Sequence, residues 1–116
     1  MAVYQHLTVT PIAQDVQENS SCVRILWQSS QTGGSYNETE RIAYYLVSVN
    51  GQTPVKHEVS YTLPMGTTKT IVDTQCTVPH DSLGNATVEV QTWMNTHISA
   101  GVVGLRQTLE LPRIPR

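Results

Sequence analysis

The sequence predicts an all-β fold: a single antiparallel β-sandwich of immunoglobulin-like type with about seven strands. Three observations predict it. Apolar and polar residues alternate with a period of two in most segments, whereas a helical period is hard to find. Thr and Val, which favour strands, are abundant, and Phe is absent. Turn signals rich in Gly, Pro and Asn divide the chain at regular intervals.

Three strands are expected in the first half of the chain. The first covers residues 4–12. The second, CVRILWQ at 22–28, places Val23, Ile25 and Trp27 on one side, so Trp27 is predicted in the core. The third, RIAYYLVSV at 41–49, is apolar on both faces, which indicates a central strand covered on both sides.

Four more strands follow, and three of them alternate clearly. Residues 55–63 put Val55, His57, Val59, Tyr61 and Leu63 on one face. Residues 86–94 put Val88, Val90, Thr92 and Met94 opposite Thr87, Glu89, Gln91 and Trp93. Residues 102–111 put Val103, Leu105, Leu109 and Leu111 opposite Arg106, Thr108 and Glu110. Residues 68–78 are less regular. One polar side per strand is typical of an antiparallel sheet that packs on one face.

The turns fit this frame. Asn50-Gly51 is a strong hairpin signal between two alternating segments, and residues 31–38 form a predicted mobile loop around two glycines. The stretch TVPHDSLGNATVEV (77–90) raises the question of a site at His80 and Asp81. Pro79 ends a strand, Asp81 can accept backbone N–H groups, and Gly84-Asn85 supports positive φ. Adjacent side chains of an extended chain point opposite ways, so a corner is predicted instead of a dyad.

Length and charge exclude several functions. The 116 residues are expected to form one domain, large enough to fold without a metal or disulfide. A net charge of −2 with 14% charged residues is too neutral for nucleic-acid binding by charge. No apolar run approaches the ~20 residues of a membrane span, and the first residues lack signal-peptide features. We therefore expect no membrane insertion, and a protein kept inside a cell or released other than by secretion.

No catalytic or metal-binding residue is predicted. The acidic residues are scattered, the histidines share no ligand spacing, and no hydrolase, zinc or phosphate-loop motif occurs. We expect a non-enzyme without cofactors. His57, on an apolar face, is interpreted as a core or interface histidine. Cys22 and Cys76 form a disulfide only if their strands are neighbours, and two small buried thiols are the favoured alternative.

The predicted contact residues are Trp93, Gln91, Glu89 and Tyr36. By alternation Trp93 points outward among Glu89 and Gln91, where an indole can stack on a sugar ring or anchor a protein contact. Two alternatives compete with this: a crossing loop that covers Trp93, or a register slip of one residue that turns it inward. Tyr36 lies in the glycine-rich loop.

The corner and the C-terminus also carry a resemblance. The residues Thr77, Val78, His80, Asp81 and Gly84, followed by Leu111, Pro112, Ile114, Pro115 and Arg116, match a T-V-x-H, turn and L-P-x-I-P-R pattern. This pattern resembles a β-sandwich domain of minor structural proteins in the tails and baseplates of bacteriophages and prophages of Gram-positive bacteria. It covers about the last 45 residues. Leu83 departs from it, because the family usually has an Asp before the glycine.

The resemblance implies a phage virion protein. The sandwich would occupy residues 1–111, and residues 112–116 would form a Pro-rich tail or linker. Its function would be structural, in a tail, fibre or baseplate, and would mediate assembly or host-surface adhesion. Its partners would be other virion proteins or copies of itself, and it would be made in the host cytoplasm. The alternative is a carbohydrate-binding module for a bacterial cell-wall polysaccharide.

Overall fold

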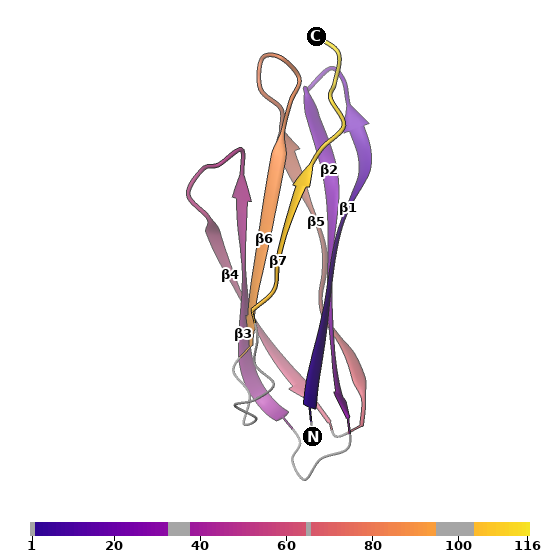
Figure 1. The fold of residues 1–116 in the computed structure, drawn as a ribbon, viewed down its shortest axis with the longest axis vertical. Helices are drawn as coiled ribbons and strands as arrows, with labels where there is room; N and C mark the ends of the chain where they lie inside the picture. The colour runs from indigo at the N-terminus through magenta and orange to yellow at the C-terminus, as the bar shows by residue number, and fades with distance from the viewer. Residues whose placement is uncertain (1, 33–37, 65, 95–103) are drawn as a thin grey trace.

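The computed structural model describes residues 2–32, 38–64, 66–94 and 104–116, and it confirms the predicted antiparallel β-sandwich. A three-stranded sheet in the order β1-β2-β5 packs against a four-stranded sheet in the order β4-β3-β6-β7 (Figure 1). The strands are β1 (Ala2–Asp15), β2 (Ser20–Thr32), β3 (Glu38–Val49), β4 (Val55–Leu63), β5 (Thr68–Pro79), β6 (Thr87–Met94) and β7 (Arg106–Glu110). In constant-type immunoglobulin domains the fourth strand pairs in the other sheet; here β4 pairs with β3.

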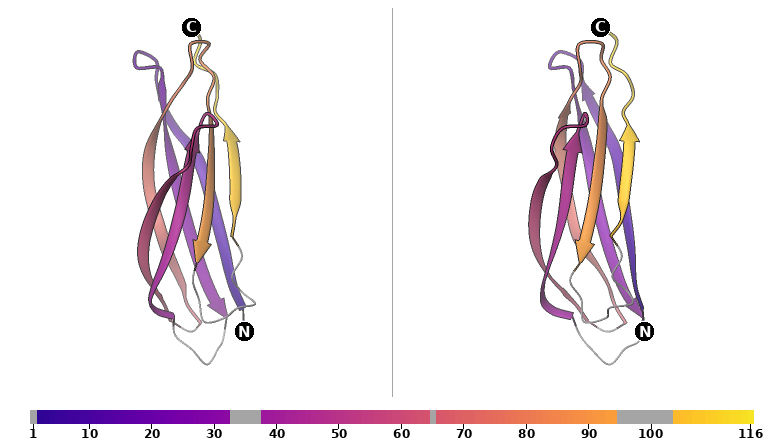
Figure 2. Two further views of the ribbon diagram at one scale, coloured as in Figure 1. Left: turned by 90° about the vertical axis from the view of Figure 1, so that its left-hand side faces the viewer. Right: turned by 60° about the vertical axis from the view of Figure 1, so that its left-hand side comes forward.

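The molecule is long and narrow, with extents of 55 × 23 × 18 Å. The strands run along the long axis in every view (Figures 1 and 2). The chain crosses between the sheets after β2, β4 and β5, whereas β1–β2, β3–β4 and β6–β7 are neighbours in one sheet. Sequence-distant strands are thereby brought together, and β6 lies between β3 and β7.

The core is formed by the inward residues of the central strands, as alternation predicts. Val23, Ile25 and Trp27 of β2 and Val88, Val90 and Met94 of β6 are fully buried. Trp27 donates its indole N–H to Oε1 of Gln5 at 3.2 Å, which satisfies the one polar atom of this core side chain. The prediction for Trp27 is confirmed.

The Asn50-Gly51 hairpin is confirmed as well. Asn50 and Gly51 have φ angles of 52° and 73°, and the N–H of Gln52 donates to the carbonyl of Val49 at 2.9 Å. Positive φ at both central residues defines a type I′ turn, whose twist matches that of the flanking strands. Asn50 also accepts the N–H of Thr87 at 2.9 Å and so links this hairpin to β6.

The segment after β5 is the predicted corner. Oδ1 of Asp81 accepts the N–H groups of Leu83 and Asn85, each at 2.9 Å. Gly84 has a φ of 86°, whereas Asn85 does not adopt positive φ. The Asp81 carboxylate and the backbone bonds between Asp81 and Asn85 therefore hold the turn, and Leu83 contributes no carboxylate to it.

His80 is a buried part of this corner. Its Nδ1 lies 2.7 Å from the carbonyl of Gly84, and its Nε2 lies 2.7 Å from Oγ of Ser21. A carbonyl can only accept, so Nδ1 carries a proton and donates it. His80 and Asp81 have separate partners and form no dyad, as predicted.

The C-terminal tail packs on the same corner. Leu111 donates its N–H to Ala86 at 3.0 Å, and Ile114 donates to the carbonyl of Gly84 at 2.9 Å. The side chain of Ile114 is fully buried. Residues 112–116 form no strand, but buried packing continues as far as Ile114.

One prediction for the four-stranded sheet is wrong, and another is confirmed only in part. β3 is central, yet its outer face is not covered, because Ile42 on that face is 52% exposed. On β4 the inward face is buried only at Tyr61 and Leu63, while Val55 and His57 are exposed. The first half of β4 is separated from β5 of the other sheet by a hollow, so its inward side chains are not covered. His57 is therefore not in the core, and its assignment to an interface stays a prediction.

The cysteines are both free. Their strands are neighbours, as a disulfide would require, but Cys22 is in register with Thr77 and Cys76 with Val23. Val23 points into the core, so Cys76 faces inward and Cys22 outward. Both side chains are half-buried. Burial raises the pKa of the Cys76 thiol, and the nearby Cys22 adds to the effect.

Candidate functional site

Trp93 lies on the outer face of the four-stranded sheet, as strict alternation predicts. Its neighbours along β6, Thr92 and Met94, are buried, whereas Trp93 is 37% exposed. The structure thus decides against the register slip that would turn the indole inward. We call the outer surface of β3, β4, β6 and β7 around Trp93 the aromatic face.

Tyr44 is the partner of Trp93 across the sheet, and sequence reasoning missed it. The two residues are in direct register between β3 and β6, and their rings stack with centroids 5.1 Å apart and planes 20° apart. The ammonium of Lys56, on β4, lies 4.5 Å from the centre of the Tyr44 ring. Lys56 also contacts Glu58 at 3.3 Å. A cation, a phenol and an indole therefore stand in a row across three strands.

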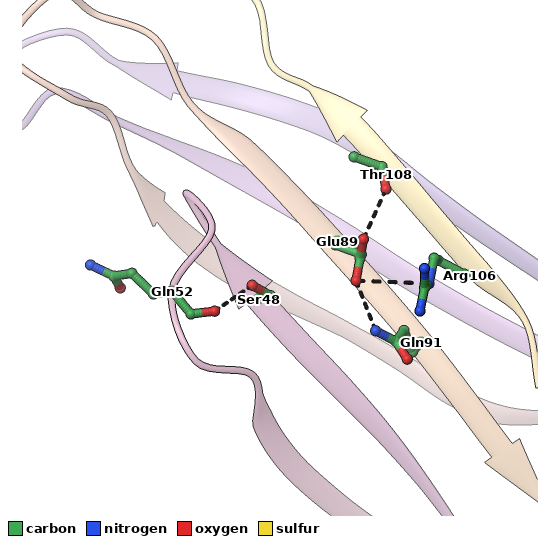
Figure 3. Close-up of polar contacts among 6 residues, drawn as sticks. All are labelled: Ser48, Gln52, Glu89, Gln91, Arg106 and Thr108. Atoms are coloured by element: carbon green, nitrogen blue, oxygen red, sulfur yellow. Dashed lines mark hydrogen bonds and ion pairs between the residues drawn. The ribbon is translucent and has the colours of Figure 1, made fainter.

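Glu89 organises the polar part of this face. Its Oε1 accepts from Nε2 of Gln91 at 2.8 Å, and its Oε2 accepts from the Thr108 hydroxyl at 3.2 Å. Nε of Arg106 lies 3.9 Å from Oε1. Figure 3 shows these side chains of β6 and β7 together around the Glu89 carboxylate. The oxygens of the Glu89 carboxylate are thus largely engaged by side chains of β6 and β7.

Gln91 and Arg106 present the remaining polar atoms. They are directly opposite in the β6–β7 register. Because Nε2 of Gln91 is held by Glu89, its Oε1 points away from Glu89, toward the end of β6 that carries Trp93 (Figure 3). The Arg106 side chain is 66% exposed, and its terminal nitrogens have no bonding partner among the described residues. An acceptor and a pair of donors therefore lie beside the indole.

An apolar strip completes the aromatic face. Ile42, Tyr44 and Leu46 alternate along the outer side of β3, and Leu46 is in register with Gln91. Ile42 is 52% exposed, and Leu46 is half-buried. The face therefore combines an apolar centre with polar groups on both flanks, an arrangement that recognition surfaces share.

Three of the four predicted contact residues, Trp93, Gln91 and Glu89, lie together on this face. The fourth, Tyr36, lies outside the described residues. Tyr44, Lys56 and Arg106 were missed because each belongs to another strand, and the sequence alone does not fix which residues are paired. The usable signal was the outward phase of Tyr44 in AYYL, opposite to that of buried Tyr45.

A hollow opens between β4 and β5 beside the first half of β4. It measures about 400 Å³, and its walls include Val47, Val55 and Cys76. The rings of Tyr45 and His57, also in the wall, stack with centroids 4.8 Å apart. The pKa of Tyr45 is raised by burial and, to a lesser extent, by Cys76.

Among residues 2–32, 38–64, 66–94 and 104–116, no three His, Cys, Asp or Glu side chains are grouped in a way that could hold a metal ion. In the same residues no helix is long and apolar enough to cross a membrane. Comparison of the chain with protein-family models, curated proteins and solved structures gives no match.

Proposed function

We propose that the chain is a non-enzymatic structural module of a phage virion, associated with a tail, fibre or baseplate, and that it mediates assembly or host-surface adhesion. The phage assignment rests on the resemblance of residues 77–84 and 111–116. The observation that carries the recognition role is the aromatic face, where a stacked Tyr44–Trp93 pair is partly exposed on the outer side of the sheet. Exposed aromatic residues of this kind are typical anchors of interfaces.

Labelling of virions tests the assignment. Phages are induced from the bacterium that carries the gene, purified, and incubated with gold-labelled antibodies against this protein. Electron micrographs should show gold at the tail end of the particles, and mass spectrometry of the purified particles should detect peptides of the chain. Particles without either signal would refute the virion assignment.

The second candidate function is binding of a bacterial cell-wall polysaccharide. The observation that favours it is the exposed indole of Trp93 beside the polar atoms of Gln91 and Arg106, which suits an apolar sugar face bordered by hydroxyl groups. Trp27 is fully buried, so changes of tryptophan fluorescence report mainly on Trp93.

A fluorescence titration tests binding of the polysaccharide. Purified cell-wall polysaccharide from Gram-positive bacteria should change the emission in a saturable manner. In a Trp93→Phe variant the same titration should leave the remaining Trp27 emission unchanged. A flat titration of the wild-type protein, combined with an oligomer in solution scattering, would leave assembly as the role of the face.

A further inference from the structure

We propose that the aromatic face binds a neutral pyranose chain, lying along β6 with one sugar on Trp93 and the next over Gln91 and Arg106. This inference rests on the carbohydrate-binding function proposed above and names its ligand class. It adds Arg106 as a ligand-contacting residue, and Tyr44 and Lys56 as positioning residues. None of these three follows from the sequence pattern alone.

The strand sets the spacing of the two subsites. Trp93 and Gln91 are successive residues on the outer side of β6, and alternate residues of a strand are about 6.8 Å apart. Arg106 stands beside Gln91 on the neighbouring strand. The polar pair therefore lies one step along β6 from the indole, within reach of the sugar linked to the one on Trp93. A disaccharide spans both positions and a monosaccharide does not.

The polar atoms suit hydroxyl groups. Oε1 of Gln91 is an acceptor, because the amide nitrogen is fixed on Glu89 at 2.8 Å. The guanidinium of Arg106 offers only donors, in a planar fork. A sugar hydroxyl both donates and accepts, so two adjacent hydroxyls can satisfy Gln91 and Arg106 at once.

The charges favour a neutral sugar. Each cation of the face already has a carboxylate: Arg106 lies 3.9 Å from Glu89, and Lys56 lies 3.3 Å from Glu58. Among the described residues both cations of this face are thus partly neutralised, and an acidic sugar would also approach the carboxylate of Glu89. Repulsion between like charges at such short range disfavours it.

Tyr44 and Lys56 act on the ligand through Trp93. One face of the indole is occupied by the Tyr44 ring, and the Lys56 ammonium lies over Tyr44. The stacking of Tyr44 on Trp93 restricts the rotamers of the Trp93 side chain, so less side-chain entropy is lost when a sugar binds.

Isothermal titration with defined oligosaccharides tests the ligand class. The probes are neutral hexose mono-, di- and tetrasaccharides and acidic oligogalacturonides of equal length, each at 50 and 500 mM NaCl. We expect binding of a neutral disaccharide, at least tenfold weaker binding of its monosaccharide, and no salt dependence. Preference for the acidic series, with affinity lost at high salt, would overturn the inference but leave carbohydrate binding intact. Binding of no sugar would overturn both, and virion labelling would remain a separate test.

Variants test the assigned residues. Trp93→Ala should abolish binding, and Gln91→Ala and Arg106→Gln should each weaken it about tenfold, as expected for the loss of one hydrogen-bonding group. Gln28→Ala, on the outer side of the other sheet, is the matched control and should bind normally. Tyr44→Ala should weaken binding, and Tyr44→Phe should restore it because the ring remains. Equal affinities of Tyr44→Ala and wild type would remove the positioning role.

Discussion

At Gly84 two distant parts of the chain come into close contact. A Cβ built on it would overlap the backbone carbonyl of Ile114, and its φ of +86° lies in the region that L side chains rarely adopt. Its own carbonyl accepts two hydrogen bonds, from His80 and from Ile114. Three requirements, on space, on backbone angle and on hydrogen bonding, therefore meet at one position.

Gly84→Ala should lower the free energy of unfolding by well over 1 kcal/mol, since incompatible substitutions cost more than the usual Gly-to-Ala effect. Gly51→Ala is the control. Gly51 also has positive φ, at +73°, but no atom lies within 4 Å of its built Cβ. Urea unfolding of both variants separates the close contact from the backbone angle. Equal losses of unfolding free energy in the two variants would show that the close contact between Gly84 and Ile114 has no effect on stability.

Asp73 offers a prediction about pH. Arg24 contacts both of its carboxylate oxygens, at 2.9 and 2.8 Å, and this hydrogen-bonded pair lowers the pKa of Asp73 below its ordinary 3.8. A lowered pKa in the folded state stabilises the protein above the unfolded-state pKa. That contribution is lost as the pH falls through the folded-state pKa. The pair is solvent-exposed, so the effect on stability is small.

An NMR titration of the Asp73 carboxyl should place its midpoint below 3.8. In Arg24→Met the midpoint should return to the ordinary range, because the cation and its hydrogen bonds are gone. Identical midpoints in the two proteins would show that the pair does not persist in solution.

At the scale of the strands, alternation explains what could be predicted from the sequence. It places Trp93 outward and Val88, Val90 and Met94 inward, because adjacent residues of a strand face opposite sides. The Asn50-Gly51 turn was predictable for an equally local reason. Cross-strand partners were not, since the stack of Tyr44 on Trp93 depends on a register that two whole strands determine. The exposure of Val55 and His57 was not predictable either, because it depends on how the two sheets approach each other beside the hollow between β4 and β5.

The cysteines give a prediction at this scale. They lie on adjacent strands but on opposite faces of the sheet. Under oxidising conditions the protein should therefore keep two free thiols. Mass spectrometry after alkylation in denaturant should find two modified cysteines, and reductant should not change the unfolding midpoint. In the folded protein Cys76 should react slowly, because its raised pKa reduces the thiolate fraction. Single-cysteine variants, Cys22→Ser and Cys76→Ser, measure each rate. A mass two daltons low would contradict the register.

At the scale of the molecule, the C-terminal tail joins elements far apart in the sequence. The side chain of Gln14 donates to the carbonyl of Pro112 at 2.8 Å, and Arg116 donates to the carbonyl of Val16 at 2.6 Å. The tail also bonds to Gly84 on the corner. It thereby closes the end of the sandwich at which the β1–β2 turn and the corner meet (Figure 1). Residues 77–84 and 111–116, which lie far apart in the sequence, are thus in contact in the fold.

Ile114 should therefore be a structural residue of the whole domain. It is fully buried although it lies in a tail without strand structure. Ile114→Ala should lower the free energy of unfolding by about 2–5 kcal/mol, the range for removing a buried Ile side chain. Ile12→Ala is matched in chemistry but not in burial, since Ile12 is 48% exposed, and it should cost far less. Urea unfolding followed by circular dichroism measures both. If the two variants lost the same small amount, the tail would be a free extension, and the contact between the two halves of the motif would not stabilise the fold.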